Sequence, residues 1–294
     1  MNLINILEEI EKVDGEIYER LSPRRKAMKD FWNMSSKVAL SALPLAVGTM
    51  FNKAYGATPS VIIEVLQYAL TLEHFEYNFY KKGLEVNSAI PTGAQKAALE
   101  MIRDSELKHV NFLKAVIPTV VQGTQPVAEK TNYDFTAMGT FPDVLSNYTT
   151  FLAVAQVLED TGVRAYKGRA GDILGEPVIL TAALGIHAVE ARHAAKIRYM
   201  RRLNGATMPS TLGSGAVKPW IAGSPAVFND TGVTAANGNY GGATPENTVV
   251  QAGVTITSLP GVGGNISYSA AAEAFDEPLT KAEVLALVAP FGVS

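Results

Sequence analysis

The stretches Glu106-Leu-Lys-His109 and Glu190-Ala-Arg-His193 share one pattern, a glutamate three residues before a histidine. Each stretch lies in a run whose apolar residues recur at helical spacing. Residues three apart on an α-helix lie on the same face about one turn apart, so each pair directs an oxygen and a nitrogen donor to one point. The spacing predicts two helices that each offer a carboxylate and an imidazole to a metal ion.

Each of these pairs has a matching partner upstream. Ala69-Leu-Thr-Leu-Glu73, followed by Tyr80, recurs as Ala155-Gln-Val-Leu-Glu159, followed by Tyr166. The upstream glutamate stands 33 residues before its Glu-x-x-His pair in the first half and 31 residues before it in the second. The repeat therefore predicts a duplicated helical hairpin with four glutamates and two histidines in register.

The hydrophobic period and the capping signals together predict four long helices, over residues 58–83, 95–118, 142–168 and 177–204. Thr58-Pro59 favours the first start, because proline suits the first helical turn. Thr92-Gly-Ala-Gln95 has the form of a capping box for the second start, and Pro118 predicts the end of that helix. Residues 119–139 show no such period, so we expect one long crossover between the second and third helices.

The N-terminal region, residues 1–57, has two interpretations. Its apolar residues from Leu3 to Ile17 recur at helical spacing, which predicts a helical arm. Arg24-Arg25, followed by the apolar stretch Val38 to Phe51, is similar to a twin-arginine export signal. That apolar stretch is too short to span a membrane as a helix. The protein is accordingly expected to be either cytoplasmic or exported, and both alternatives stay open.

The composition changes after residue 204. Residues 205–294 are rich in glycine, proline and threonine, which predicts a C-terminal extension of loops and short strands. The strands are expected near Val249–Val250 and Val254–Thr257, and Thr280-Lys-Ala-Glu283 predicts a capping box for a last short helix. Two apolar sites are expected to anchor this extension to the bundle: Pro219-Trp220-Ile221 and Phe228.

Composition excludes several kinds of chemistry. The 294-residue chain contains no cysteine, so thiolate metal sites and cysteine nucleophiles are ruled out. A net charge of −3 gives no reason to expect a nucleic-acid partner. Any reaction must use oxygen and imidazole groups or a bound cofactor.

The arrangement of glutamate, Glu-x-x-His, glutamate and Glu-x-x-His on four helices with a long crossover resembles the ferritin-like di-iron carboxylate proteins. With the stretch Ala274–Glu283 of the extension, the chain is more specifically similar to bacterial ferritin-like proteins related to plant desiccation-associated proteins. The resemblance implies an all-α ferritin-like four-helix bundle over residues 58–204. It also implies two bound iron ions, with manganese as the alternative.

The same resemblance implies a role for each of six ligands. Glu73 with His109 would hold one metal ion, and Glu159 with His193 the other. The remaining two ligands, Glu106 and Glu190, would bridge the ions. No catalytic residue is expected beyond these ligands.

Five further residues lie near the predicted ligands. Tyr80 and Tyr166 are interpreted as core residues or residues that support the ligands, and His187 as a structural residue or one that lines an entrance. Glu76 is an alternative to Glu73, because it lies one turn further along the helix. His74 is expected on the surface, since it points about 100° away from Glu73.

Two classes of function follow. A di-iron centre that reacts with O2 or peroxide, with Fe(II) oxidation as its simplest outcome, is the first, and a manganese centre that disproportionates peroxide is its variant. The second is a non-catalytic stress or desiccation protein that uses the bundle as a scaffold. The arm or the extension is expected to mediate any homo-oligomer, and the large extension argues against an iron-storage cage.

Overall fold

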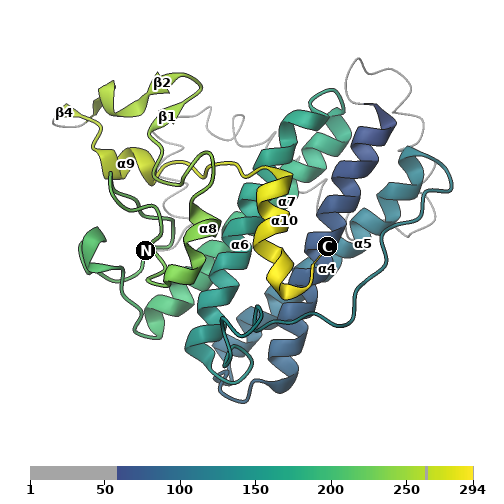
Figure 1. Cartoon of the computed structure of the whole chain (residues 1–294), viewed down its shortest axis with the longest axis horizontal. Coiled ribbons are helices and arrows are strands. Elements are labelled where there is room, and N and C mark those ends of the chain that lie inside the picture. Colours follow the sequence, from purple (N-terminus) through teal and green to yellow (C-terminus); the bar gives the residue numbers. More distant parts are fainter. Residues whose placement is uncertain (1–57, 262–263, 294) are drawn as a thin grey trace, which may run out of the picture. The chain divides into compact units, whose positions relative to one another are not determined.

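The computed structural model describes residues 58–261 and 264–293. The predicted N-terminal arm and the export signal in residues 1–57 lie outside these described residues. The structure confirms the expected all-α core, which consists of four long helices: α4 (Pro59–Val86), α5 (Ala94–Val120), α6 (Tyr148–Ala170) and α7 (Pro177–Leu203). Helix α4 packs mainly against α5, and α6 packs mainly against α7, so two helical hairpins form the bundle (Figure 1).

The apolar residues of the bundle form two clusters along its axis. On α5, Leu99 and Ile102 belong to the first cluster, whereas Val110 and Leu113 belong to the second. On α7, Ile197 lies in the first cluster and Ile179 in the second. The predicted ligands of each helix fall between these positions, so the polar residues are enclosed by apolar packing on both sides.

The long connection between α5 and α6 covers one face of α4. Gln67 of α4 donates to the carbonyl oxygen of Gln125 at 2.7 Å and accepts from the backbone nitrogen of Val127 at 2.7 Å. Further along the same face, Asn78 donates to Glu129 at 2.8 Å. The prediction that His74 lies on the surface is therefore wrong, because this connection leaves its side chain only 2% exposed.

Three predicted helix boundaries differ from the structure. Gly93 caps α5 with φ at +86°, so Thr92 does not form the expected capping box. Pro118 lies within the last turn of α5 and does not end it. Helix α6 begins at Tyr148, six residues after Pro142, because the Asn147 side chain accepts hydrogen bonds from the backbone nitrogens of its first turn.

The extension after α7 consists of loops, short helices and two-residue strands; the loops, the first pair of strands and the last helix were expected, whereas α8, α9 and the second pair of strands were not. Its α-helices are α8 (Asn237–Tyr240), α9 (Tyr268–Ala272) and α10 (Lys281–Val288). Its strands form two antiparallel pairs, β1 (Val250–Gln251) with β2 (Val254–Thr255) and β3 (Pro260–Gly261) with β4 (Gly264–Asn265). Short 3₁₀ helices follow α6 at Gly171–Ile173 and lie in the extension at Ser210–Leu212, Thr234–Ala236, Ile256–Ser258 and Ala289–Phe291. The predicted capping box of Thr280 and Glu283 is present at the start of α10.

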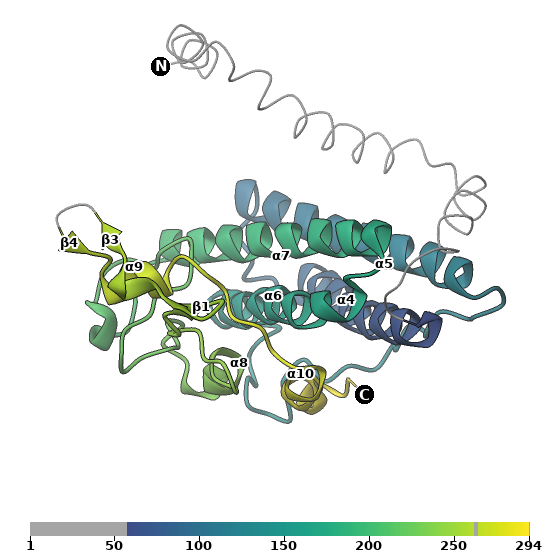
Figure 2. The same cartoon turned by 90° about the horizontal axis from the view of Figure 1, so that it is seen from above.

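The extension packs against the bundle at two places. Helix α10 lies along the side formed by α4 and α6 (Figure 2), where Val284 and Val288 join the first apolar cluster. Ile221 packs with Val157 of α6, in agreement with the predicted anchor. Trp220 of the same predicted anchor is half exposed, and its indole nitrogen donates to Glu273 of the extension. Among the described residues, no helix has the length and apolar character needed to cross a membrane.

Candidate metal centre

Six polar side chains meet in the middle of the bundle, and each long helix contributes to the set. They are Glu73 from α4, Glu106 and His109 from α5, Glu159 from α6, and Glu190 and His193 from α7. All six are buried, and the four glutamates have no exposed surface. The structure thus brings together every residue that the repeat placed in register.

The six side chains form two groups of four. Glu73, Glu106, His109 and Glu190 make the first group, and Glu106, Glu159, Glu190 and His193 make the second. Within each group, one donor atom from every residue lies within 4.8 Å of the others. Glu106 and Glu190 belong to both groups, so the arrangement resembles a carboxylate-bridged binuclear metal site.

The two imidazole rings are crowded by carboxylate oxygens. His109 Nδ1 lies 3.0 Å from Glu73 Oε2, 2.9 Å from Glu106 Oε2 and 3.4 Å from Glu190 Oε1. His193 Nδ1 lies 2.6 Å from Glu106 Oε1 and 3.3 Å from Glu159 Oε2. One ring nitrogen carries at most one proton, so it cannot satisfy several oxygens at once.

Several buried oxygen and nitrogen atoms of these ligands have no hydrogen-bond partner. Both oxygens of Glu190, one oxygen each of Glu106 and Glu159, and His193 Nδ1 lack a partner of acceptable geometry among the described residues. Buried polar atoms without partners are costly, and carboxylate oxygens with imidazole nitrogens are the donors that iron and manganese accept. The residues present therefore fit two divalent metal ions.

Burial and neighbouring charges shift the pKa values of the side chains in this cluster. Burial raises the pKa of Glu73 to about 7 despite the nearby His109. Burial, with Glu106 and other carboxylates, raises the pKa of Glu190 well above its usual range. Burial opposes protonation of His193, but Glu159 and Glu106 outweigh it and raise the pKa of His193 to about 10. Without metal, protons must hold the carboxylates together.

Two tyrosines link the hairpins through the ligands. The hydroxyl of Tyr80 on α4 donates to Glu159 on α6, and the hydroxyl of Tyr166 on α6 donates to Glu73 on α4. The two bonds have the same pattern in opposite directions, as the repeat requires. Each tyrosine thus positions a carboxylate that belongs to only one of the two groups.

Glu76 is the buried carboxylate that the repeat does not explain. It is 4% exposed and lies outside both groups of four. Burial and the charges of Glu73, Glu106 and Glu159 raise the pKa of Glu76 well above its usual range. In the sequence, Glu76 stands one turn after Glu73. This spacing predicts that both side chains lie on one face of the helix, but it does not predict the contacts of Glu76.

Glu76 and Glu190 both lie close to Gly162 of α6. A Cβ atom on Gly162 would lie 2.8 Å from Glu190 Oε2 and 3.2 Å from Glu76 Oε1. The absent side chain at this position leaves room for both carboxylates. His187 does not join them, because its Nδ1 lies 3.0 Å from the carbonyl oxygen of Val163 and burial lowers its pKa.

Comparison with known proteins agrees with this geometry. The family model described as Ferritin-like domain matches residues 62–202, which include all six predicted ligands. A search of the curated proteins found no match to the chain.

Proposed function

We propose that the ferritin-like domain of this protein binds two iron ions and reacts with O2 or peroxide. The observation that carries the proposal is the pair of donor groups that share Glu106 and Glu190. In this assignment Glu73 and His109 would hold one ion, Glu159 and His193 would hold the other, and both ions would share Glu106 and Glu190. The assignment gives each ion both a carboxylate and an imidazole.

Charge balance supports two divalent ions. The four assigned carboxylates carry −4 when ionised, and two divalent cations carry +4, so a loaded cluster is neutral inside a low-dielectric core. Glu76 adds a fifth buried carboxyl group next to this cluster. Burial and the neighbouring carboxylates raise the pKa of Glu76, which favours its neutral form and limits its effect on the charge balance.

The reaction follows from the redox chemistry of bound iron. Bound Fe(II) would supply the two electrons that, with two protons, reduce O2 to hydrogen peroxide. The protein residues supply binding and orientation. Tyr80 and Tyr166 hold Glu159 and Glu73 in place, and the apolar clusters on both sides exclude bulk water.

Metal stoichiometry under anaerobic conditions tests the proposal. Full-length protein given Fe(II) without oxygen should bind two ions per chain, and admitted O2 should then be consumed. The double variant Glu106→Ala with His109→Ala should lose this binding, whereas Asp104→Ala on the exposed face of the same helix should retain it. Binding of less than one ion per chain by the unaltered protein would contradict the proposal.

The same variants separate the proposal from a non-catalytic role. If the bundle is only a scaffold in a stress or desiccation protein, loss of Glu106 and His109 leaves assembly and protection unchanged. Manganese-loaded protein that disproportionates peroxide but does not oxidise Fe(II) would identify the manganese variant. The relationship to desiccation-associated proteins, a homo-oligomer and export remain predictions.

A further inference from the structure

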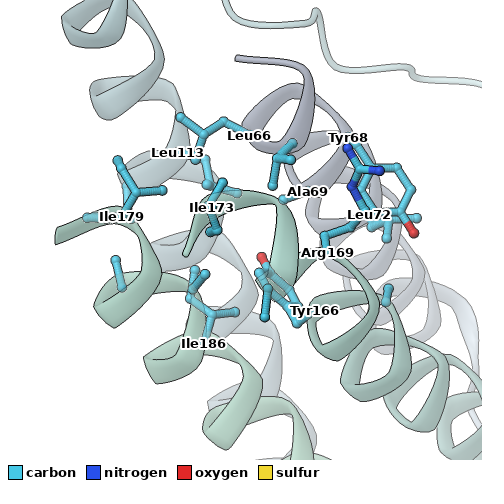
Figure 3. Close-up of a pocket in the computed structure, with 16 residues that line it drawn as sticks. Leu66, Tyr68, Ala69, Leu72, Leu113, Tyr166, Arg169, Ile173, Ile179 and Ile186 are labelled. Atoms are coloured by element: carbon cyan, nitrogen blue, oxygen red, sulfur yellow. The ribbon is translucent and has the colours of Figure 1, made fainter. Parts of the chain in front are cut away.

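A pocket lies among the four long helices, inside the second apolar cluster (Figure 3). It is partly open to solvent, and its surface is almost entirely apolar. Sixteen residues line it, and all but three have side chains that contain only carbon and hydrogen. The exceptions are Tyr68, Tyr166 and Arg169.

The pocket lies one helical turn from the candidate metal centre on three helices. Ala69 lines the pocket four residues before Glu73, and Ile186 lines it four residues before Glu190. Leu113 lines it four residues after His109, on the third helix. Four residues rise about 6 Å along a helix, so these three lining residues lie one turn from ligands of the first donor group.

Tyr166 forms the wall between the pocket and the centre. Its ring lines the pocket, and its hydroxyl donates to Glu73. That hydroxyl is therefore already occupied. Beside this ring the pocket is lined by aliphatic side chains such as Ile186 (Figure 3).

The other two polar residues lie at one side of the pocket. Figure 3 shows Tyr68 and Arg169 together, away from Ile173 and Ile179. The Arg169 guanidinium forms ion pairs with Glu64 and Asp172, although its Nε and the Tyr68 hydroxyl have no hydrogen-bond partner among the described residues. Apart from these two residues, the lining offers only hydrocarbon side chains and Tyr166, whose hydroxyl already donates to Glu73.

This wall discriminates between the two candidate oxidants. Hydrogen peroxide and water must give up hydrogen bonds to enter a carbon-lined space, which is costly, and apolar cavities stay dry. Dioxygen makes no such bonds, so it loses nothing on entry. We infer that this pocket binds dioxygen and admits it to the metal centre, and that hydrogen peroxide does not use this route. Binding of dioxygen in the pocket does not depend on the proposed function, whereas its reaction at the metal centre does.

Xenon is a suitable probe of the pocket, because it is apolar and binds such cavities. Xenon should bind the full-length chain at the pocket in pressurised crystals or in xenon NMR. Ala183→Phe, which fills the pocket from α7, should abolish the signal, and Ala170→Phe from α6 provides a second blocking variant. Ala188→Phe, on the exposed face of α7, is the matched control and should leave the signal unchanged.

The same variants should separate the two oxidants. The Ala183→Phe variant should bind Fe(II) like the unaltered protein, since no ligand is changed. Oxidation of the bound Fe(II) by O2 should be slower by about tenfold or more. Its oxidation by added peroxide should remain within about twofold of the unaltered rate. Ala170→Phe should behave in the same way, which excludes a folding defect peculiar to one substitution.

Three results would overturn the inference. They are the absence of xenon from the pocket of the unaltered protein, equal slowing of both oxidants in the blocked variants, and unchanged oxidation by O2 in variants that have lost xenon. Failure to bind Fe(II) would instead contradict the proposed function, while xenon binding still tests the pocket. The two failures are therefore distinguishable.

Discussion

Gly162 determines how closely the carboxylates of α4 and α7 approach α6. We predict that Gly162→Ala lowers metal binding, because the new Cβ would lie 2.8 Å from Glu190 Oε2 and displace a carboxylate that belongs to both donor groups. Helix propensity alone favours alanine over glycine by about 1 kcal/mol, so a loss of metal cannot come from weaker helix formation. The number of Mn(II) or Fe(II) ions bound per chain measures the effect.

Gly171, at the end of the same helix, gives the matched control for Gly162. Its φ is −61°, and no atom lies within 4 Å of the position that a Cβ would take. Gly171→Ala should therefore bind the full number of ions. Two tightly bound ions in Gly162→Ala would show that Glu190 does not need this space.

Glu76 gives a second prediction for a single residue. The folded protein raises the pKa of this carboxyl group well above its usual range, so at neutral pH folding must either retain a proton or bury a charge. Glu76→Gln removes that penalty and should stabilise the metal-free protein at pH 8 by about 1 kcal/mol or more. Urea denaturation measures the change. Glu85→Gln, on the exposed end of α4, should have no effect, and a destabilised Glu76→Gln would assign Glu76 a required charge.

The six proposed ligands could be selected from sequence because two spacings restrict them. The i, i+3 rule places each glutamate on the face of its histidine, and the repeat then selects Glu73 and Glu159. Neither rule applies to Glu76, which has no counterpart in the register. These rules also could not predict the burial of His74, because that burial depends on the path of the connection between α5 and α6, which has no hydrophobic period.

At the level of helices, the apolar period predicted the number and order of the long elements, but not where they begin. Helix starts depend on single capping contacts, and several residues can supply them. Thr92 offered a capping box, but the chain starts α5 from Gly93 in a left-handed conformation. Asn147 supplies the actual cap of α6 and lies within a polar stretch that also contained the plausible start at Pro142.

Arg164 of α6 attaches the extension to the bundle. It is 1% exposed, forms an ion pair with Glu246 at 2.7 Å, and donates to the carbonyl oxygens of Glu277, Gly241 and Thr244 at 2.8, 3.0 and 2.7 Å. No sequence pattern predicts this contact, because the partners of Arg164 are mostly backbone atoms far along the chain.

We predict that Arg164→Met lowers the free energy of unfolding by about 3–5 kcal/mol, because it leaves Glu246 buried without its partner. Loops of the extension should also become sensitive to a protease. The double variant Arg164→Met with Glu246→Gln should recover part of the loss, since burial raises the pKa of Glu246 to about 8 and an amide removes the remaining cost of ionising or protonating this group. Equal stability of the single variant and the unaltered protein would show that the extension is held elsewhere.

For the whole molecule, metal binding and folding should be coupled through protons. In the metal-free protein Glu159 and Glu106 raise the pKa of His193 to about 10 in spite of burial, whereas the unfolded chain has an ordinary histidine pKa near 6.5. The folded state therefore binds more protons between these values. The stabilisation is complete below about pH 6.5 and is lost as the pH rises toward 10, by up to about 1.4 kcal/mol per pH unit.

A bound metal ion changes this dependence, because a ligating imidazole carries no proton on the ligating nitrogen. The free energy of unfolding should thus fall between pH 7 and pH 9 in the presence of a chelator, and fall less with saturating Mn(II). The stabilisation by metal, measured as the difference between the two denaturation curves, should increase with pH. The double variant Glu106→Ala with His109→Ala should show no such difference at either pH. A difference that is independent of pH in the unaltered protein would mean that His193 is not a metal ligand.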